Sequence, residues 1–128
     1  MRECSPKGCL VSDSSLNLAR LTDLLGDDRA AIVEILDLAV GTCRKALDTL
    51  RSLGSKSPAP AIEHAAHAMK GAAANVGAEA LASLATGLEE QARHERIADF
   101  EQSLREIASE FHRFEGAVRA YHGGSDAT

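Results

Sequence analysis

Aromatic residues are scarce in this sequence. The 128 residues include three phenylalanines, one tyrosine and no tryptophan, and the apolar share of 45% is mainly alanine and leucine. Alanine, leucine, glutamate and arginine are good helix formers, whereas β-branched and aromatic residues are favoured in strands. The composition therefore predicts an all-α fold. The length fits one domain that can bury a core without disulfides or metal ions.

Several other features are absent, and each absence argues against a class of protein. The formal net charge is −5, so no strongly basic face is expected for binding nucleic acid. No apolar run reaches the roughly 18 residues needed to span a bilayer, and we expect no direct membrane insertion. The N-terminal segment also lacks the apolar centre of a secretory signal. The three cysteines form neither a CxxC pair nor a zinc-ligand array, which favours a reduced, cytoplasmic setting.

The chain divides into a head, a helical region and a tail. Residues 1–13 show no periodicity and are expected to be a flexible head or linker, and residues 123–128 are expected to be a flexible tail. Between them, residues 14–122 predict five helices. Their expected positions are Leu16–Leu25 ending at Gly26, a second helix capped by Asp27 or Asp28 and ending near Leu53-Gly54, a third from Pro60 to Val76 after the start signal Ser57-Pro58, a fourth after Gly77, and a last one from about Ile97 to Tyr121.

Apolar residues recur at helical spacing in the long helices. Four amphipathic helices with short connections predict an antiparallel four-helix bundle, with the short first helix as an additional N-terminal element. The predicted core stripes are Ile32, Leu36, Ala39, Cys43, Ala46, Leu47 and Leu50 in the second helix, Leu81, Leu84, Leu88 and Ala92 in the fourth, and Ile97, Phe100, Leu104, Ile107, Phe111, Phe114, Val118 and Tyr121 in the last.

The third predicted helix carries a histidine on its outer face. An α-helix turns about 100° per residue, so its core face contains Ile62, Ala66, Met69, Ala73 and Val76. His67 lies about 140° from Ile62 by the same arithmetic and should point to solvent.

The neighbours of this histidine on the helix surface are His64, Lys70, Gly71 and Ala74. Glycine inside a helix costs about 1 kcal/mol relative to alanine, which favours a functional reason for Gly71. Its missing side chain would let another protein approach His67, and Ala74 keeps the same approach low. Lys70 offers a cation to any anion on the imidazole. Neutral imidazole is a competent nucleophile near pH 7. Together these residues predict a transient phosphoryl carrier.

The segment from His67 through Lys70, Gly71 and Gly77 to Leu81 matches the pattern HxxKGxxxxxGxxxL. With the five-helix layout, it resembles the histidine-containing phosphotransfer domains of multistep two-component signalling, over about Leu16 to Tyr121. Such domains relay a phosphoryl group between the aspartates of receiver domains.

The resemblance implies a role for each matching residue. His67 would be phosphorylated through Nε2, Lys70 would steady the phosphate, and Gly71 would provide clearance. The partners would be response-regulator receiver domains, which would also supply the Mg²⁺ of the reaction, so that no cofactor is expected on this chain. A polar side chain commonly holds the acceptor ring in this family; the candidates here are Glu63, His64 and Gln91.

Other interpretations stay open or are disfavoured. The chain has no Glu-x-x-His pair and no HExxH segment, so we predict no metal site. No nucleotide-binding glycine loop is present, and we expect a monomeric phosphotransfer intermediate, not an enzyme. The alternative is a helical adaptor that docks a signalling protein independently of phosphate. The sequence also leaves open a free-standing carrier or a domain of a hybrid sensor kinase, which could tether it to a membrane. The head favours the second.

Overall fold

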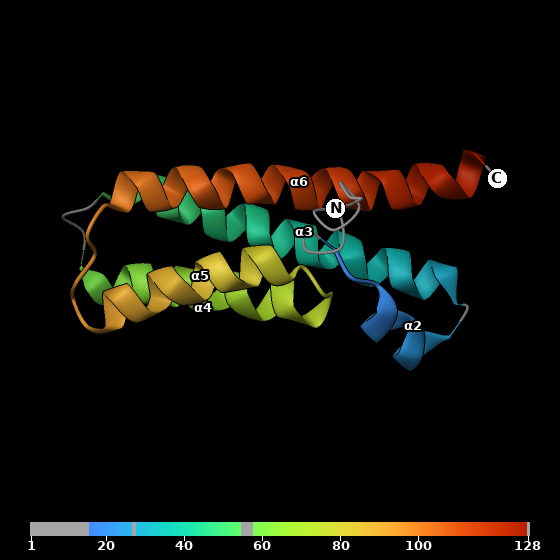
Figure 1. Cartoon of the computed structure of the whole chain (residues 1–128), viewed down its shortest axis with the longest axis horizontal. Coiled ribbons are helices and arrows are strands. Elements are labelled where there is room, and N and C mark those ends of the chain that lie inside the picture. The colour runs from blue at the N-terminus through green and yellow to red at the C-terminus, as the bar shows by residue number, and fades with distance from the viewer. Residues whose placement is uncertain (1–15, 27, 55–57, 128) are drawn as a thin grey trace, which may run out of the picture.

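The protein is a bundle of α-helices. The computed structural model describes residues 16–26, 28–54 and 58–127, and within these ranges it contains five helices and no strand (Figure 1). The helices are α2 (Ala19–Leu25), α3 (Arg29–Ser52), α4 (Ala59–Asn75), α5 (Glu79–Arg93) and α6 (Phe100–Ala127). The predicted all-α fold of four long helices and one short N-terminal helix is confirmed. The predicted head, with Cys4 and Cys9, lies outside the described residues.

The four long helices pack in a ring. Helix α3 contacts α4 and α6, and α5 contacts the same two helices, while α2 contacts α3. In Figure 1 successive long helices run in opposite directions, and α4 and α5 form a hairpin shorter than α3 and α6. At one end of the bundle, α3 and α6 extend past the α4–α5 hairpin, and α2 lies next to the hairpin at that end. The α4–α5 hairpin therefore forms one side of an antiparallel four-helix bundle.

The core consists of the apolar stripes of these helices. All seven predicted positions of α3 are buried, as are the five predicted positions from Ile62 to Val76. On α5 the predicted Leu81, Leu88 and Ala92 are buried, and the predicted Leu84 is half-buried and packs against the core. The buried residues of the last stripe are Phe100, Ile107, Phe111, Phe114 and Val118. Its partly buried residues, which pack against the core, are Ile97, Leu104 and Tyr121.

Side-chain hydrogen bonds to the backbone mark where two helices begin. Asp28 caps α3 by accepting a hydrogen bond from the backbone N–H of Ala31 at 3.1 Å, whereas Asp27, the other predicted cap, lies outside the described residues. The prediction that α2 begins at Leu16 was wrong. The helix begins at Ala19, and the side chain of Asn17, just before the N-cap Leu18, accepts a hydrogen bond from the backbone N–H of Ala19 at 3.0 Å.

The turn between α4 and α5 requires a glycine. Gly77 has a φ of +78°, in the left-handed region that favours glycine, as the sequence predicts. Its carbonyl accepts a hydrogen bond from the backbone N–H of Asn17 at 2.8 Å. A Cβ on Gly77 would collide with the backbone carbonyl of Asn17. This contact ties the segment before α2 to the hairpin that carries His67.

Two further features concern the ends and surface of the bundle. Helix α6 continues to Ala127, so its backbone is helical in most of the predicted tail. Each residue added to an existing helix closes one more hydrogen bond, which offsets the low propensity of Gly123 and Gly124. Ser57, part of the predicted start signal of α4, lies outside the described residues, and Pro58 precedes the helix. Among the described helices, none is both long and apolar enough to cross a membrane.

Candidate functional site

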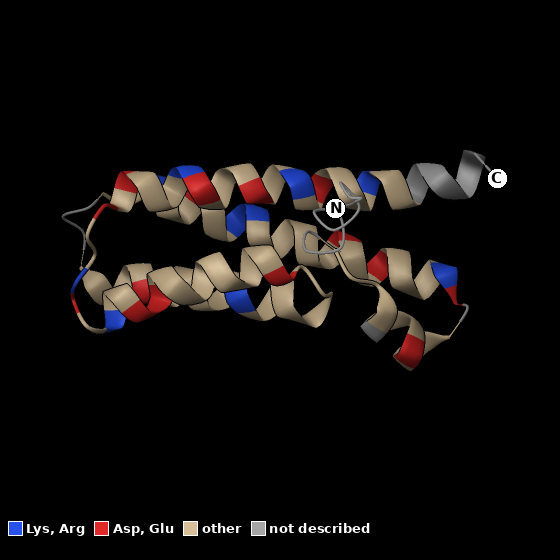
Figure 2. Ribbon diagram, in the orientation of Figure 1, with Lys and Arg blue, Asp and Glu red and all other residues tan. Residues whose placement is uncertain are grey.

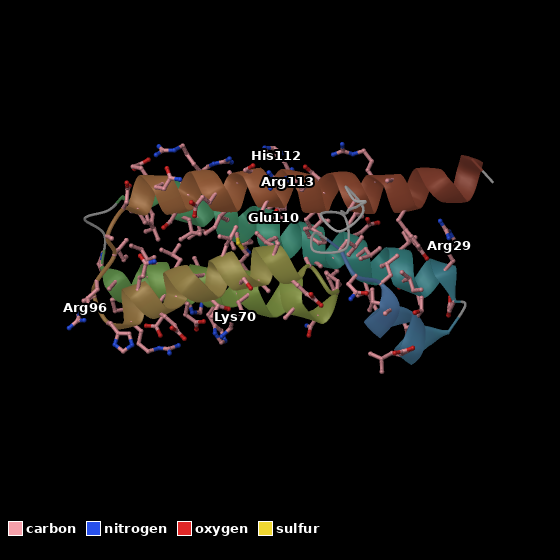
Figure 3. All side chains as sticks on the ribbon, viewed as in Figure 1. Arg29, Lys70, Arg96, Glu110, His112 and Arg113 are labelled. Atoms are coloured by element: carbon pink, nitrogen blue, oxygen red, sulfur yellow. The ribbon has the colours of Figure 1, made fainter. Side chains whose placement is uncertain are left out.

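His67 lies on the outer face of α4. Its side chain is 65% exposed, as the helical arithmetic predicts, while Ala66 and Met69 beside it are buried in the core. His64, Gly71 and Ala74 are exposed on the same helix. Figure 3 shows Lys70 on the side of the hairpin that faces away from α6. The structure therefore places all five predicted site residues along one accessible stretch of α4.

A buried carboxylate from α5 lies beside the histidine. Glu89 is only 3% exposed. Its Oε2 is 2.7 Å from Nδ1 of His67 and 3.2 Å from Nη2 of Arg93, and its Oε1 is 2.7 Å from Nζ of Lys70. His67, Lys70 and Arg93 thus surround one carboxylate, and we call these four residues the Glu89 cluster.

The charge state of Glu89 decides which nitrogen of His67 carries the proton. The hydrogen bond from Lys70 lowers the pKa of the Glu89 carboxyl, burial acts in the opposite direction, and the hydrogen bond with His67 lowers the pKa further. An ionised carboxylate can only accept hydrogen bonds, so Nδ1 of His67 is the donor. In the neutral ring this leaves Nε2 unprotonated, with a lone pair available for nucleophilic attack.

The surface next to His67 is open at Gly71. A Cβ built on Gly71 would meet no atom within 4 Å, so the space above this position is open. Within α4, Glu63 and Lys70 are the only residues of the Lys, Arg, Asp and Glu types (Figure 2). A partner could therefore approach Nε2 over Gly71 without meeting a side chain at that position.

The three predicted candidates for holding the ring were wrong, because the contact is made by Glu89. Glu63 instead accepts a hydrogen bond from Nε of Arg93 at 3.2 Å. His64 lies on the exposed face, and the side-chain oxygen of Gln91 is buried without a partner. A signal in the sequence could have identified Glu89. It follows Leu88 and precedes Ala92 on the stripe that α5 turns to the core, where an ionised residue needs a partner.

Metal ligands do not gather in the described part of the chain. Residues 16–26, 28–54 and 58–127 contain no group of three or more His, Cys, Asp and Glu side chains arranged to hold an ion. Cys43 is buried, and burial raises the pKa of its thiol to about 12, so it is neither a ready ligand nor a nucleophile. The exposed imidazole of His67 is the more reactive group.

Comparison with known proteins agrees with this site. The family model described as Hpt domain matches residues 34–117. The fold is similar to the crystal structure of histidine-containing phosphotransfer protein B (HptB) from Pseudomonas aeruginosa PAO1, with a TM-score of 0.72, 26% sequence identity, and coverage of 84% of this chain and 95% of that chain. No curated protein sequence matches.

These findings define the class of protein. The chain belongs to the Hpt domain family, as its resemblance to histidine-containing phosphotransfer domains predicted. It has a phosphotransfer role in a two-component phosphorelay. Members of this family are phosphocarriers that interact with receiver domains and are not themselves catalysts.

Proposed function

We propose that this protein accepts a phosphoryl group on Nε2 of His67 from the phosphoaspartate of one receiver domain and passes it to another. The observation that carries this proposal is the contact between Nδ1 of His67 and the buried carboxylate of Glu89. It fixes the ring in the tautomer whose free lone pair is on Nε2, while 65% of the side chain stays exposed.

On this protein, the bonds that form and break during transfer are all at the imidazole ring of His67. The lone pair of Nε2 attacks phosphorus as the bond to the aspartyl oxygen breaks, and the aspartate leaves as a carboxylate. The Nδ1 proton stays on the ring, which becomes an imidazolium bearing the phosphoryl group. Glu89 lies against that proton and stabilises the positive charge. The reverse steps deliver the group to the second receiver.

The surroundings of His67 suit this exchange. Lys70 is one turn away and 33% exposed, within reach of an anion on the ring. Gly71 leaves the approach open. The Mg²⁺ that neutralises phosphate during transfer is expected on the receiver. We also propose that the carrier acts as a monomer.

A phosphotransfer assay tests the proposal. Receiver domains encoded in the same genome would be phosphorylated, isolated and mixed one at a time with the wild type, His67→Gln and His64→Gln. The His64 variant is a matched control, because it removes an exposed histidine one turn away on the same helix. Label should reach the wild type and His64→Gln, resist alkali and be released by acid, as a phosphoramidate is. It should be absent from His67→Gln.

Two results would contradict the proposal. Full labelling of His67→Gln would place the acceptor elsewhere. Receivers that bind the wild type tightly but never transfer label to it would favour the adaptor function. Circular dichroism and melting should be nearly equal for all three proteins, because substitution of an exposed side chain seldom changes stability by more than about 0.5 kcal/mol.

A further inference from the structure

Lys70 is already paired in the unphosphorylated protein. Its Nζ lies 2.7 Å from Oε1 of Glu89, and the carboxylate is 3% exposed. Lys70 can give its full charge to a phosphoryl group on His67 only by loosening its contact with Glu89. A buried carboxylate that loses its counter-ion is strongly destabilised. When Lys70 leaves, the imidazolium of phosphorylated His67 still contacts Glu89, and a second cation that stays on the carboxylate favours the departure of Lys70.

Arg93 is placed to be that cation. Its Nη2 lies 3.2 Å from Oε2 of Glu89, the oxygen that also contacts His67, so it does not compete with Lys70 for Oε1. Its Nε lies 3.2 Å from Oε2 of Glu63, which is on α4 one turn before His67. The planar guanidinium thus bridges carboxylates from both helices of the hairpin. The hydrogen bond to Glu63 also raises the pKa of Arg93, whose guanidinium is charged at any working pH in either case.

The phosphoryl group changes the balance between these contacts. A protein-bound phosphoryl group carries about −1.5 to −2 charges near pH 7, against −1 for a carboxylate. Lys70 is a flexible point charge on a long stem, whereas Arg93 is held by two carboxylates. Lys70 is therefore the cation that moves, and Arg93 is the one that stays.

We propose that Arg93 is a positioning residue that keeps Glu89 neutralised and thereby releases Lys70 to the phosphoryl group on His67. This inference rests on the proposed function, because it assumes that His67 is phosphorylated. It assigns Arg93 and its anchor Glu63 a part in the exchange without contact to the phosphoryl group. Without Arg93, the phosphorylated ring of His67 would balance Glu89 less completely, and Lys70 would be held on the carboxylate more strongly.

A double-mutant cycle tests the proposal. The phosphorylated fraction at equilibrium with a transferring receiver would be measured for the wild type, Lys70→Gln, Arg93→Gln and the double variant. Lys70→Gln should lower the equilibrium ratio severalfold in the wild-type background and change it little in the Arg93→Gln background. In the Arg93→Lys background, Lys70→Gln should again lower the equilibrium ratio by most of the factor seen in the wild type.

The matched control is Arg119→Gln. This change removes the same charge from an exposed arginine of α6 that pairs with Glu115. The effect of Lys70→Gln should be as large in this background as in the wild type. A second measurement is the ¹⁵N NMR signal of the Lys70 ammonium, assigned by its absence in Lys70→Gln. Phosphorylation should shift this signal in the wild type and in Arg119→Gln, but much less in Arg93→Gln.

The outcomes separate this inference from the proposed function. A wild type that takes no phosphoryl group on His67 would overturn both. A normally phosphorylated wild type with an equal effect of Lys70→Gln in the Arg93→Gln background would overturn the role of Arg93 alone. The same conclusion would follow if Lys70→Gln had no effect in any background. Arg93 is half-exposed, so Arg93→Gln should fold, and Glu63→Gln provides a second, milder weakening of the same anchor.

Discussion

Nδ1 of His67 on α4 lies 2.7 Å from Oε2 of Glu89 on α5, a residue 22 positions later in the chain. The contact joins the exposed acceptor to the interior of the bundle through a carboxylate that is itself buried. It also draws Lys70 and Arg93 to the same point. The orientation of the reactive ring therefore depends on how α4 packs against α5.

Substitution of Glu89 should slow phosphotransfer even though His67, which accepts the phosphoryl group, is unchanged. Glu89→Ala removes the acceptor of the Nδ1 hydrogen bond and both cation contacts, so transfer should fall by more than tenfold. Glu89→Gln keeps an oxygen that can accept the hydrogen bond from Nδ1, so its transfer rate should fall less. Since hydrogen bonds to charged groups contribute about 1.5–3 kcal/mol, Glu89→Ala should also unfold more easily in urea. Transfer rates from a phosphorylated receiver check this, and equal rates for Glu89→Ala and the wild type would remove Glu89 from the site.

Substitutions of Gly71 should separate folding from docking. A Cβ at this position meets nothing within 4 Å, so Gly71→Ala should raise the free energy of unfolding by up to about 1 kcal/mol. Gly71→Gln should also fold, but its longer side chain should hold the receiver away from Nε2 and strongly reduce transfer. The comparison uses thermal unfolding and transfer rates of both variants. Near-normal transfer by Gly71→Gln would show that receivers approach from another direction.

Gly77→Ala should have the opposite effect on stability. The left-handed backbone costs a non-glycine residue about 1 kcal/mol or more, and the new Cβ would collide with the Asn17 carbonyl. We expect a lower melting temperature than for the wild type and faster amide hydrogen exchange in α2. Gly71→Ala is the control, since it adds the same methyl group to the same helical hairpin. A melting temperature at or above that of the wild type would contradict the account of this turn.

Acid should weaken the Glu89 cluster. The pKa of Glu89 is lower in the folded protein than in the unfolded chain, mainly because Lys70 donates a hydrogen bond to it. Its ionisation therefore contributes stability that is fully present above the unfolded value of about 4.3 and is lost as the pH falls through the folded value. The free energy of unfolding of the wild type should thus fall more steeply below about pH 4.3 than that of Glu89→Gln. Parallel curves in urea titrations would show that the carboxylate is not stabilised in this way.

The sequence predicts what depends on local pattern. The stripe of α3, the outward direction of His67 and the left-handed turn at Gly77 follow from helical periodicity and glycine conformation within one segment. They match the structure for that reason. The start of α2 was misplaced because the side chain of Asn17 binds the backbone N–H of Ala19, a local hydrogen bond that the apolar pattern does not reveal.

The partner of the ring was not predicted because its identity depends on the register of a second helix. Glu63, His64 and Gln91 were considered for their nearness to His67 in the expected bundle, but the register of α5 against α4 decides which side chain reaches Nδ1. That register places the buried carboxylate of Glu89 against His67. The pairing of Lys70 with Glu89, and hence the role proposed for Arg93, also depends on packing that the sequence pattern does not determine.

Phosphorylation of the acceptor nitrogen can be observed directly by NMR. Protein labelled with ¹⁵N in its histidine rings would be phosphorylated by a receiver and examined by long-range ¹H–¹⁵N correlation. The account predicts that the phosphoryl group is on Nε2 of His67, that Nδ1 of the same ring keeps its proton, and that the His64 ring is unchanged. A phosphoryl group on Nδ1 of His67 or on His64, or a wild type without phosphohistidine after contact with an active receiver, would contradict it.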